Sequence, residues 1–364
     1  MKWFVHIGTE KTGSSHLQSI MSLGRESLAA EGFAFPAGTA HDESCMQSGQ
    51  ISAGNGRRLA ASLGSHDLAA ARAEISNMAG LAKRAGRDRV IVATEWLLPV
   101  LAVKGGLSRF LGLLREQGSD AVSLLLVLRD PVDQCLSLYK HRAKSGKLSD
   151  IGDWLDKGYR LPSELTGLHE QLASCEVDLR VRRYSREPGA LEKLFFEDWL
   201  GVRVPLVDLP ATVNASLSLS ELALIHQLAL SRPELVQPMF DALARLPATD
   251  KARHAGLEDY VRAMAAAAVS ANAEEWAAWN DRLPANERLS IPERPMTLPP
   301  RPREVAFSQG QLATIAAVTA QAATLRALSR SFWHWRLRPA LRRIARRFRS
   351  SRSRQSVKSY ENSR

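Results

Sequence analysis

Cysteine is scarce in this chain. Its 364 residues include three cysteines, Cys45, Cys135 and Cys175, which stand far apart. The sequence has no CxxC pair and no cluster of Cys and His with metal-ligand spacing, so we expect no metal site of that kind. Three separated cysteines also argue against structural disulfides, and we therefore expect a reducing, cytoplasmic compartment.

Long hydrophobic runs are missing too. The chain opens with the letters MKWFVHIG, which lead directly into an expected strand, and no signal-peptide pattern with a cleavage site is present. The longest uncharged run near the C-terminus, Val305–Leu325, contains three Gln, three Thr and one Ser. Such a run is too polar to span a bilayer.

Positive charge is concentrated at one end of the chain. The formal net charge is +11, but residues 305–364 hold thirteen Lys and Arg against the single acid Glu361, which leaves −1 for residues 1–304. A basic charge spread over the fold would indicate a nucleic-acid-binding protein. Because the body is close to neutral, nucleic acid is not an expected partner of the body.

The first half of the chain alternates short apolar runs with longer amphipathic stretches. The apolar runs are rich in Val, Leu and Ile, which is typical of strands buried on both faces; they are Trp3–Ile7, Val90–Ala93, Leu124–Leu128 and Leu179–Tyr184. The expected helices lie near Ser15–Ala30, Leu68–Arg84, Leu107–Glu116 and Val132–Ala143. Strands that alternate with helices predict an α/β fold with a parallel sheet flanked by helices.

After Pro210 the pattern becomes mainly helical. The expected helices are Ser220–Leu230, behind a capping-like Ser218-Leu-Ser-Glu stretch, then Gly256–Asn280, and one near Gln309–Leu328. Six prolines between Pro284 and Pro302 predict a linker or an extended segment. We therefore divide the chain into a main domain (1–304), a C-terminal helix (305–330) and a basic tail (331–364).

A phosphate-binding pattern follows the first expected strand. Residues 8–15 have the sequence Gly-Thr-Glu-Lys-Thr-Gly-Ser-Ser, with a spacing close to the GxxxxGK[ST] phosphate loop. Small residues let backbone N–H groups approach a phosphate, and the positive end of the following helix favours one. The lysine, however, is Lys11 rather than the residue before the final hydroxyl, so the usual Mg²⁺-binding arrangement is absent. The candidate binding residues are Lys11, Thr12, Gly13, Ser14 and Ser15.

A second candidate site follows the third expected strand. Arg129 stands at the carboxyl end of that strand, where ligands bind in open parallel sheets. Asp130 and Pro131 suit the start of the next helix, and Ser137 lies about two turns along it. A guanidinium can hold a phosphate through two parallel hydrogen bonds, and we take Arg129 and Ser137 as phosphate-binding candidates.

Together, these two motifs resemble those of the PAPS-dependent sulfotransferases, where PAPS is 3′-phosphoadenosine-5′-phosphosulfate. The 5′-phosphosulfate loop of that family, K-x-G-T/S-[ST], matches Lys11–Ser15, and its 3′-phosphate motif matches Arg129, Pro131, Ser137 and Tyr139. The stretches His16–Gln18, Gly32–Pro36 and Val213–Ser216 resemble bacterial members that act on sugars. The resemblance covers about residues 2–230. It implies a P-loop-like fold and sulfuryl transfer from PAPS, without a metal, to a hydroxyl acceptor such as a carbohydrate or glycolipid.

Three residues are candidates for the general base. Sulfuryl transfer needs positive charge at the leaving phosphate, which Lys11 can supply, and a base within reach of the acceptor hydroxyl. His41 is the first candidate because an ordinary histidine titrates near neutral pH. Glu43 and Glu95 are the alternatives. Two other functions also remain, namely an ATP-dependent phosphate-loop kinase and a non-enzymatic, membrane-associated nucleotide-binding protein.

The basic tail has a helical pattern of its own. Its large apolar residues recur at spacings of four, four, three and four, with arginines between them; they are Trp333, Leu337, Leu341, Ile344 and Phe348. This pattern favours an amphipathic helix on an anionic lipid surface, with the protein peripheral on the inner membrane face. A disordered solubilising tail, a helix docked on the body and a nucleic-acid-binding segment are the alternatives.

Overall fold

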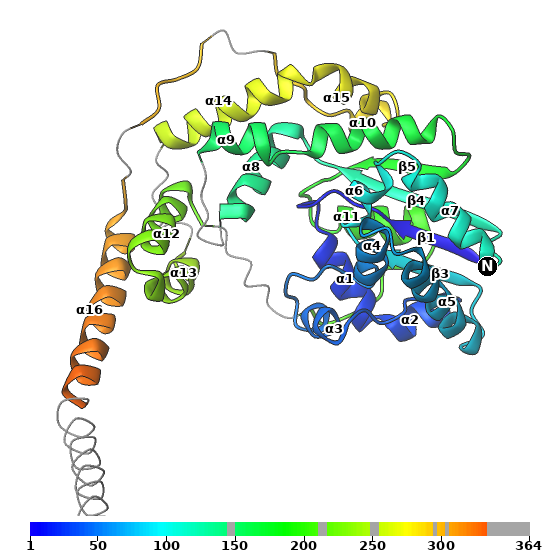
Figure 1. Ribbon diagram of the computed structural model, residues 1–364, viewed down its shortest axis with the longest axis horizontal. Helices are drawn as coiled ribbons and strands as arrows, with labels where there is room; N and C mark the ends of the chain where they lie inside the picture. The colour runs from blue at the N-terminus through cyan, green and yellow to red at the C-terminus, as the bar shows by residue number, and fades with distance from the viewer. Residues whose placement is uncertain (144–149, 210–216, 248–254, 294–296, 303–305, 333–364) are drawn as a thin grey trace, which may run out of the picture. The chain divides into compact units, whose positions relative to one another are not determined.

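The computed structural model describes residues 1–143, 150–209, 217–247, 255–293, 297–302 and 306–332. The chain divides into two compact units (Figure 1). The sheet unit contains residues 1–216 and 255–303, and the helical unit contains residues 217–254 and 304–364. Residues 217–254 thus group with the C-terminal helix rather than with the sheet.

The sheet unit is built on five strands that are all parallel, in the order β2-β3-β1-β4-β5. The strands are β1 (Lys2–His6), β2 (Phe33–Ala34), β3 (Arg89–Ala93), β4 (Ala121–Leu128) and β5 (Asp178–Arg183). The predicted α/β fold with a parallel sheet is confirmed. The sequence did not reveal β2, because two residues are too few to form a recognisable apolar run.

Helices cover both faces of this sheet. Alternate residues of a strand point to opposite faces, so Trp3, Val5 and Ile7 belong to one core cluster and Phe4 to the other. The first cluster is covered by α4 (Arg57–Gly64), α5 (Leu68–Arg84), α6 (Leu97–Leu101), α7 (Gly106–Glu116), α10 (Leu161–Leu172) and α15 (Ala273–Asn280). The second is covered by α1 (Ser14–Leu23), α2 (Arg25–Ala30), α3 (Ala40–Gln47) and the π-helix η1 (Lys193–Leu200).

Two of the expected helices are interrupted. The stretch near 15–30 forms α1 and α2, which are separated at Gly24. A Cβ atom at Gly24 would lie 2.5 Å from Cβ of Pro205, so the close approach of that loop accounts for the glycine. The stretch 256–280 forms α14 (Ala255–Ala271) and α15, with Asn272 between them. The remaining described helices of this unit are α8 (Pro131–Ala143), α9 (Ile151–Lys157), the short α11 (Ala190–Glu192) and the 3₁₀ turn η4 (Ala285–Glu287).

The described part of the helical unit contains three helices and a short turn. They are α12 (Leu219–Ser231), η2 (Pro233–Leu235), α13 (Val236–Ala244) and α16 (Gln309–Phe332). The predicted cap of α12 is confirmed as a capping box between Ser218 and Glu221. Glu221 also accepts a 2.8 Å hydrogen bond from Gln311 of α16, and both side chains are fully buried. This polar contact fixes α16 against α12.

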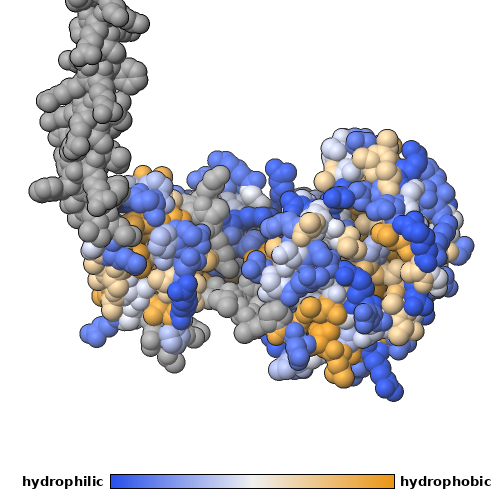
Figure 2. Space-filling model, turned by 90° about the horizontal axis from the view of Figure 1, so that it is seen from below, coloured by the Kyte–Doolittle hydropathy of each residue, from blue (hydrophilic) through white to orange (hydrophobic). Residues whose placement is uncertain are grey.

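The described helices do not include a membrane span, since none is both long and apolar enough. On the face seen in Figure 2, apolar residues form separate patches among hydrophilic ones. The expected basic helix around Trp333–Phe348 and the family-like stretch 213–216 lie outside the described residues.

His6 occupies an unusual place at the end of the central strand. Its ring is fully buried, and it packs edge-to-face on Phe195 with the centroids 5.7 Å apart. Neither ring nitrogen has a hydrogen-bond partner in the part of the chain that the structure describes. Burial disfavours the charged ring and lowers the pKa of His6 to about 4.

This buried imidazole predicts an acid sensitivity of the fold. The unfolded chain takes up a proton near the ordinary histidine pKa of 6.5, whereas the folded chain does so only near 4. The free energy of unfolding should therefore fall by about 2 kcal/mol between pH 7.5 and pH 5 through His6 alone. Urea unfolding at the two pH values measures this. His6→Leu should remove that part of the loss, whereas His41→Leu, at an exposed position on α3, should keep it. An unchanged pH dependence in His6→Leu would contradict the assignment.

Candidate functional site

The candidate site lies at the carboxyl end of β1. This strand is central, with β3 on one side and β4 on the other, so the chain passes from one side of β1 to the other between β3 and β4. In open parallel sheets, such a reversal leaves a crevice beyond the strand ends in which ligands bind. Residues 8–15 leave β1 at this point and lead into α1, as the phosphate-loop pattern predicted.

The loop is held in shape by its own threonines. Thr9 donates a 2.9 Å hydrogen bond from its hydroxyl to the carbonyl of Val127 on β4, and Thr12 donates one of 2.7 Å to the carbonyl of Thr9. Each threonine is 1 % exposed. Gly13 has a φ of 82°, and a Cβ there would lie 2.4 Å from Leu191. The Thr12 side chain therefore supports the loop. Because its hydroxyl is already used, the backbone N–H is the one donor of Thr12 that can face a ligand.

Lys11 and the start of α1 supply positive charge. Lys11 adopts a left-handed conformation with a φ of 69°, and its Nζ lies 3.5 Å from Nδ1 of His141 on α8. None of the described side chains caps the N-terminus of α1. Its first N–H groups and the positive end of the helix dipole therefore point at the same crevice as Lys11.

A pocket of about 460 Å³ brings the two sequence motifs together. Its lining includes Lys11, Gly13, Ser14 and Ser15 from the loop and Arg129 and Ser137 from the second motif. Five of the lining residues are Lys or Arg and three are Asp or Glu, so the pocket favours an anion. We call it the charged pocket. Pockets of this size hold small-molecule ligands and cofactors.

Arg129 joins the two motifs directly. Its Nη1 donates a 3.4 Å hydrogen bond to the carbonyl oxygen of Lys11, and its guanidinium lies 5.7 Å from the ring centre of Tyr184. The side chain is 14 % exposed, and burial together with the charge of Arg186 lowers its pKa. A bound anion would offset both effects, and a guanidinium can hold a phosphate through two parallel hydrogen bonds.

Asp133 forms ion pairs with three arginines around the pocket. It lies 3.8 Å from Arg129, 3.1 Å from Arg186 and 3.2 Å from Arg262. One carboxylate therefore balances three guanidinium groups and leaves an excess of positive charge. Arg129, Asp133 and Arg186 also line a neighbouring hollow of about 590 Å³ that includes Tyr184, so a long ligand has room beyond the first pocket.

The remaining residues of the second motif have different roles. Ser137 lines the charged pocket, and its hydroxyl has no hydrogen-bond partner among the described residues, so it is available to a ligand. Tyr139 is 6 % exposed and packs on Trp154 with the ring centres 5.4 Å apart. Pro131 is buried at the first position of α8. Tyr139 and Pro131 therefore shape the helix rather than contact the pocket.

The three candidate bases fall in different places. His41 is exposed on α3, contacts Cys45 at 3.8 Å, and does not line the charged pocket. Glu43 is engaged by Ser22 at 2.6 Å and Arg25 at 2.8 Å. Despite its partial burial, these contacts lower its pKa. The structure thus brings neither residue to the charged pocket. Glu43 is instead held by Ser22 and Arg25, and these tertiary contacts could not be predicted from the sequence.

Glu95 does reach the site. It follows β3 at the same edge of the sheet and lines the charged pocket. Burial raises its pKa and the charge of Glu10 adds to this, while hydrogen bonds from its backbone, Gln18 and Ser14 oppose it. A carboxylate with a raised pKa accepts protons more readily than an ordinary one.

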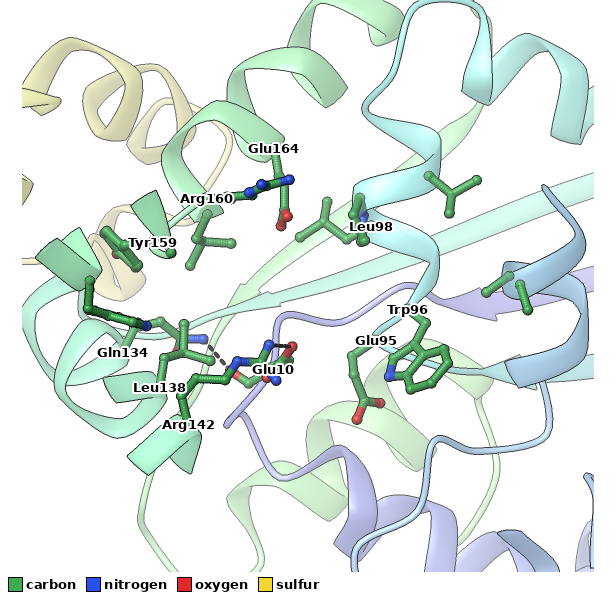
Figure 3. A pocket seen from close by; sticks show the side chains of 17 residues that line it. Glu10, Glu95, Trp96, Leu98, Gln134, Leu138, Arg142, Tyr159, Arg160 and Glu164 are labelled. Atoms are coloured by element: carbon green, nitrogen blue, oxygen red, sulfur yellow. Dashed lines mark hydrogen bonds and ion pairs between the residues drawn. The ribbon is translucent and has the colours of Figure 1, made fainter. Parts of the chain in front are cut away.

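Figure 3 shows a second pocket, of about 430 Å³. Glu10 and Glu95 line both pockets and so mark the boundary between them. The other walls of the second pocket come from α4, α6, α8 and the α9–α10 connection, and they include Trp96, Leu98 and Tyr159. Within the described residues, no group of three or more His, Cys, Asp or Glu has the arrangement of a metal site.

Sequence reasoning missed several residues of the charged pocket. They are Glu10, His16, Lys140, His141, Arg186 and Arg262. His141 had a signal, because it follows Ser137 by one helical turn and must share its face of α8. Arg262 belongs to α14, more than one hundred residues after Arg129, and only the fold brings it to Asp133, at 3.2 Å.

Comparisons of the chain with protein-family models, with curated proteins and with solved structures found no match.

Proposed function

We propose that this protein is a sulfotransferase that moves the sulfuryl group of PAPS to a hydroxyl acceptor. One observation carries the proposal: the Lys11–Ser15 loop and the Arg129/Ser137 pair line a single anion-favouring pocket and touch each other through the bond from Arg129 to the Lys11 carbonyl. A donor with phosphate groups at both ends of one nucleoside suits two phosphate-binding motifs in one pocket. ATP has no 3′-phosphate, so a kinase would leave the second motif without a ligand.

The proposed roles follow from the contacts. The loop and the uncapped start of α1 bind the 5′-phosphosulfate, and Arg129 and Ser137 bind the 3′-phosphate. Tyr184 lies beside Arg129, with its ring centre 5.7 Å from the guanidinium carbon. Lys11 faces the phosphate oxygen that leaves, where negative charge grows during the reaction, and it therefore stabilises the transition state more than the bound donor.

Glu95 is the proposed general base. The acceptor oxygen forms a bond to sulfur while the bond from sulfur to the 5′-phosphate oxygen breaks, and the hydroxyl proton goes to the Glu95 carboxylate. Its place on the boundary of both pockets lets Glu95 meet an acceptor from one pocket and the sulfuryl group from the other. The adjacent pocket is thus the proposed acceptor site. A carbohydrate or glycolipid remains the acceptor that the family resemblance favours.

The Lys11 role predicts a selective loss of turnover. Lys11→Ala should lower kcat by about 10²- to 10³-fold, because one electrostatic contact to the leaving oxygen is lost. The dissociation constant of PAP, the desulfated product, should change less. Lys157→Ala is the matched control, since Lys157 is exposed on α9 and pairs with Asp153 at 3.4 Å. Transfer of radiolabelled sulfate measures kcat, and a wild-type value in Lys11→Ala would rule out this role.

The 3′-phosphate assignment predicts a difference between two ligands. Ser137→Ala and Arg129→Gln should each weaken PAP binding, because a hydrogen bond to a charged group contributes about 1.5–3 kcal/mol. AMP, which lacks the 3′-phosphate, should bind Ser137→Ala as well as it binds the wild type. Arg129→Gln also loses its contact with the loop, so Ser137→Ala is the sharper variant, with Ser163→Ala on α10 as control. Calorimetry gives the constants; equal losses for PAP and AMP in Ser137→Ala would place the 3′-phosphate elsewhere.

The base assignment predicts a pH dependence. Glu95 acts as a base only when deprotonated, and its pKa is raised, so kcat should fall with decreasing pH at a higher pH than for an ordinary carboxyl group. Glu95→Gln should lose about 10²- to 10⁴-fold in kcat and lose this acid limb, with PAP affinity kept. His41→Ala should keep both rate and profile. The reverse result, with His41→Ala inactive and Glu95→Gln active, would return the role to the histidine.

A further inference from the structure

We propose that the pocket adjoining the charged site takes a cationic acceptor, a compound that carries an amine beside its hydroxyl groups. This inference rests on the proposed function and specifies its acceptor. The pocket of about 430 Å³ is lined by three carboxylates, Glu10, Glu95 and Glu164, which approach the same hollow from different sides (Figure 3). In Figure 3 the Glu164 carboxylate points from α10 toward the space above Glu10 and Glu95.

The charges of these carboxylates are not all balanced within the pocket. Glu10 pairs with Arg142 at 2.6 Å. Glu95 and Glu164 form no ion pair with any described residue, although Arg160 also lines the pocket. Burial raises the pKa of Glu164 and the charge of Glu10 raises it further, while Arg160 and Arg142 lower it in part. A positive charge in the hollow would therefore relieve the repulsion between the carboxylates.

Two buried polar atoms point to a ligand independently of charge. Gln134 is 1 % exposed and lines the pocket, and its Oε1 has no hydrogen-bond partner among the described residues. The hydroxyl oxygen of Tyr159 is also buried and without a partner in that part of the chain. Buried polar groups are normally paired, so both are suited to the hydroxyl or amine groups of a bound molecule.

The other walls of the pocket define the rest of the acceptor. Leu98, Pro99, Leu138 and Leu161 form apolar surface, and Trp96 stands at the edge with 42 % of its surface exposed. One apolar face and one polar edge are what an amino sugar or a similar ring presents. We place the amine at Glu164, because Glu95 at the pocket boundary is committed to the hydroxyl that reacts.

Three hexoses of the same ring size but different charge test this inference. The dissociation constants of glucosamine, glucose and glucuronate are measured by NMR titration of the full chain saturated with PAP. Glucosamine should bind at least about tenfold more tightly than glucose, because its amine makes a charge-assisted hydrogen bond to Glu164, and glucuronate should bind most weakly. Glu164→Gln should abolish the preference for glucosamine and leave glucose binding unchanged. Glu170→Gln, an exposed position on the same helix, is the control.

Several outcomes would overturn the inference. They are equal binding of glucosamine and glucose, a preference for glucuronate, a preference that survives Glu164→Gln, or no binding of any of the three sugars. PAP is titrated separately into the same protein, and the three sugar titrations are repeated without PAP. Loss of PAP binding with a retained amine preference would contradict the proposed function alone, whereas normal PAP binding without the amine preference would contradict this inference alone.

Discussion

The parallel pairing of β1 with β4 is the constraint on which the site depends. Lys2 pairs with Ala121 and His6 with Leu125, so the two strands end at the same edge of the sheet. The hydrogen bonds continue beyond β1, because Ile7 donates to Leu125 at 3.0 Å and the Thr9 hydroxyl to Val127 at 2.9 Å. The loop after β1 and the residues after β4 are thereby held side by side. Without this register, Arg129 would not meet the Lys11 carbonyl.

The charged pocket combines this rigid frame with an excess of positive charge. The buried threonines, Gly13 and the neutral His6 beneath the loop hold the backbone in place without placing a counter-charge in the crevice. The arginines around Asp133 and the uncapped helix start then favour an anion. Positioning and electrostatic stabilisation of this kind supply most of the catalysis in group transfer from phosphates. The neighbouring pocket has a net charge of the opposite sign, since three carboxylates and two arginines line it together with apolar residues.

The sequence predicted features that depend on local pattern. Strands β1, β3 and β4 appear in the sequence as buried apolar runs. The run Leu179–Tyr184 does contain β5, but the expectation that it is buried on both faces was wrong, because only Val181 of this strand is buried. The loop and the Arg129–Ser137 motif appear as spacing after strands β1 and β4. The two-residue β2 and the helix break at Gly24 could not be predicted, because one is too short for a pattern and the other depends on contact with Pro205. His41 looked suitable by its chemistry alone. The position of Glu95 just after an expected strand made it a candidate base, but only the fold shows that it borders two pockets.

A crystal structure of the full chain with PAP would show how the two phosphate-binding motifs are used. We expect the 5′-phosphate against the backbone of Lys11–Ser15 and the 3′-phosphate within hydrogen-bond distance of both Arg129 and Ser137, with the adjoining pocket left open. A nucleotide bound in the opposite direction, or a 3′-phosphate that contacts neither residue, would contradict this expectation.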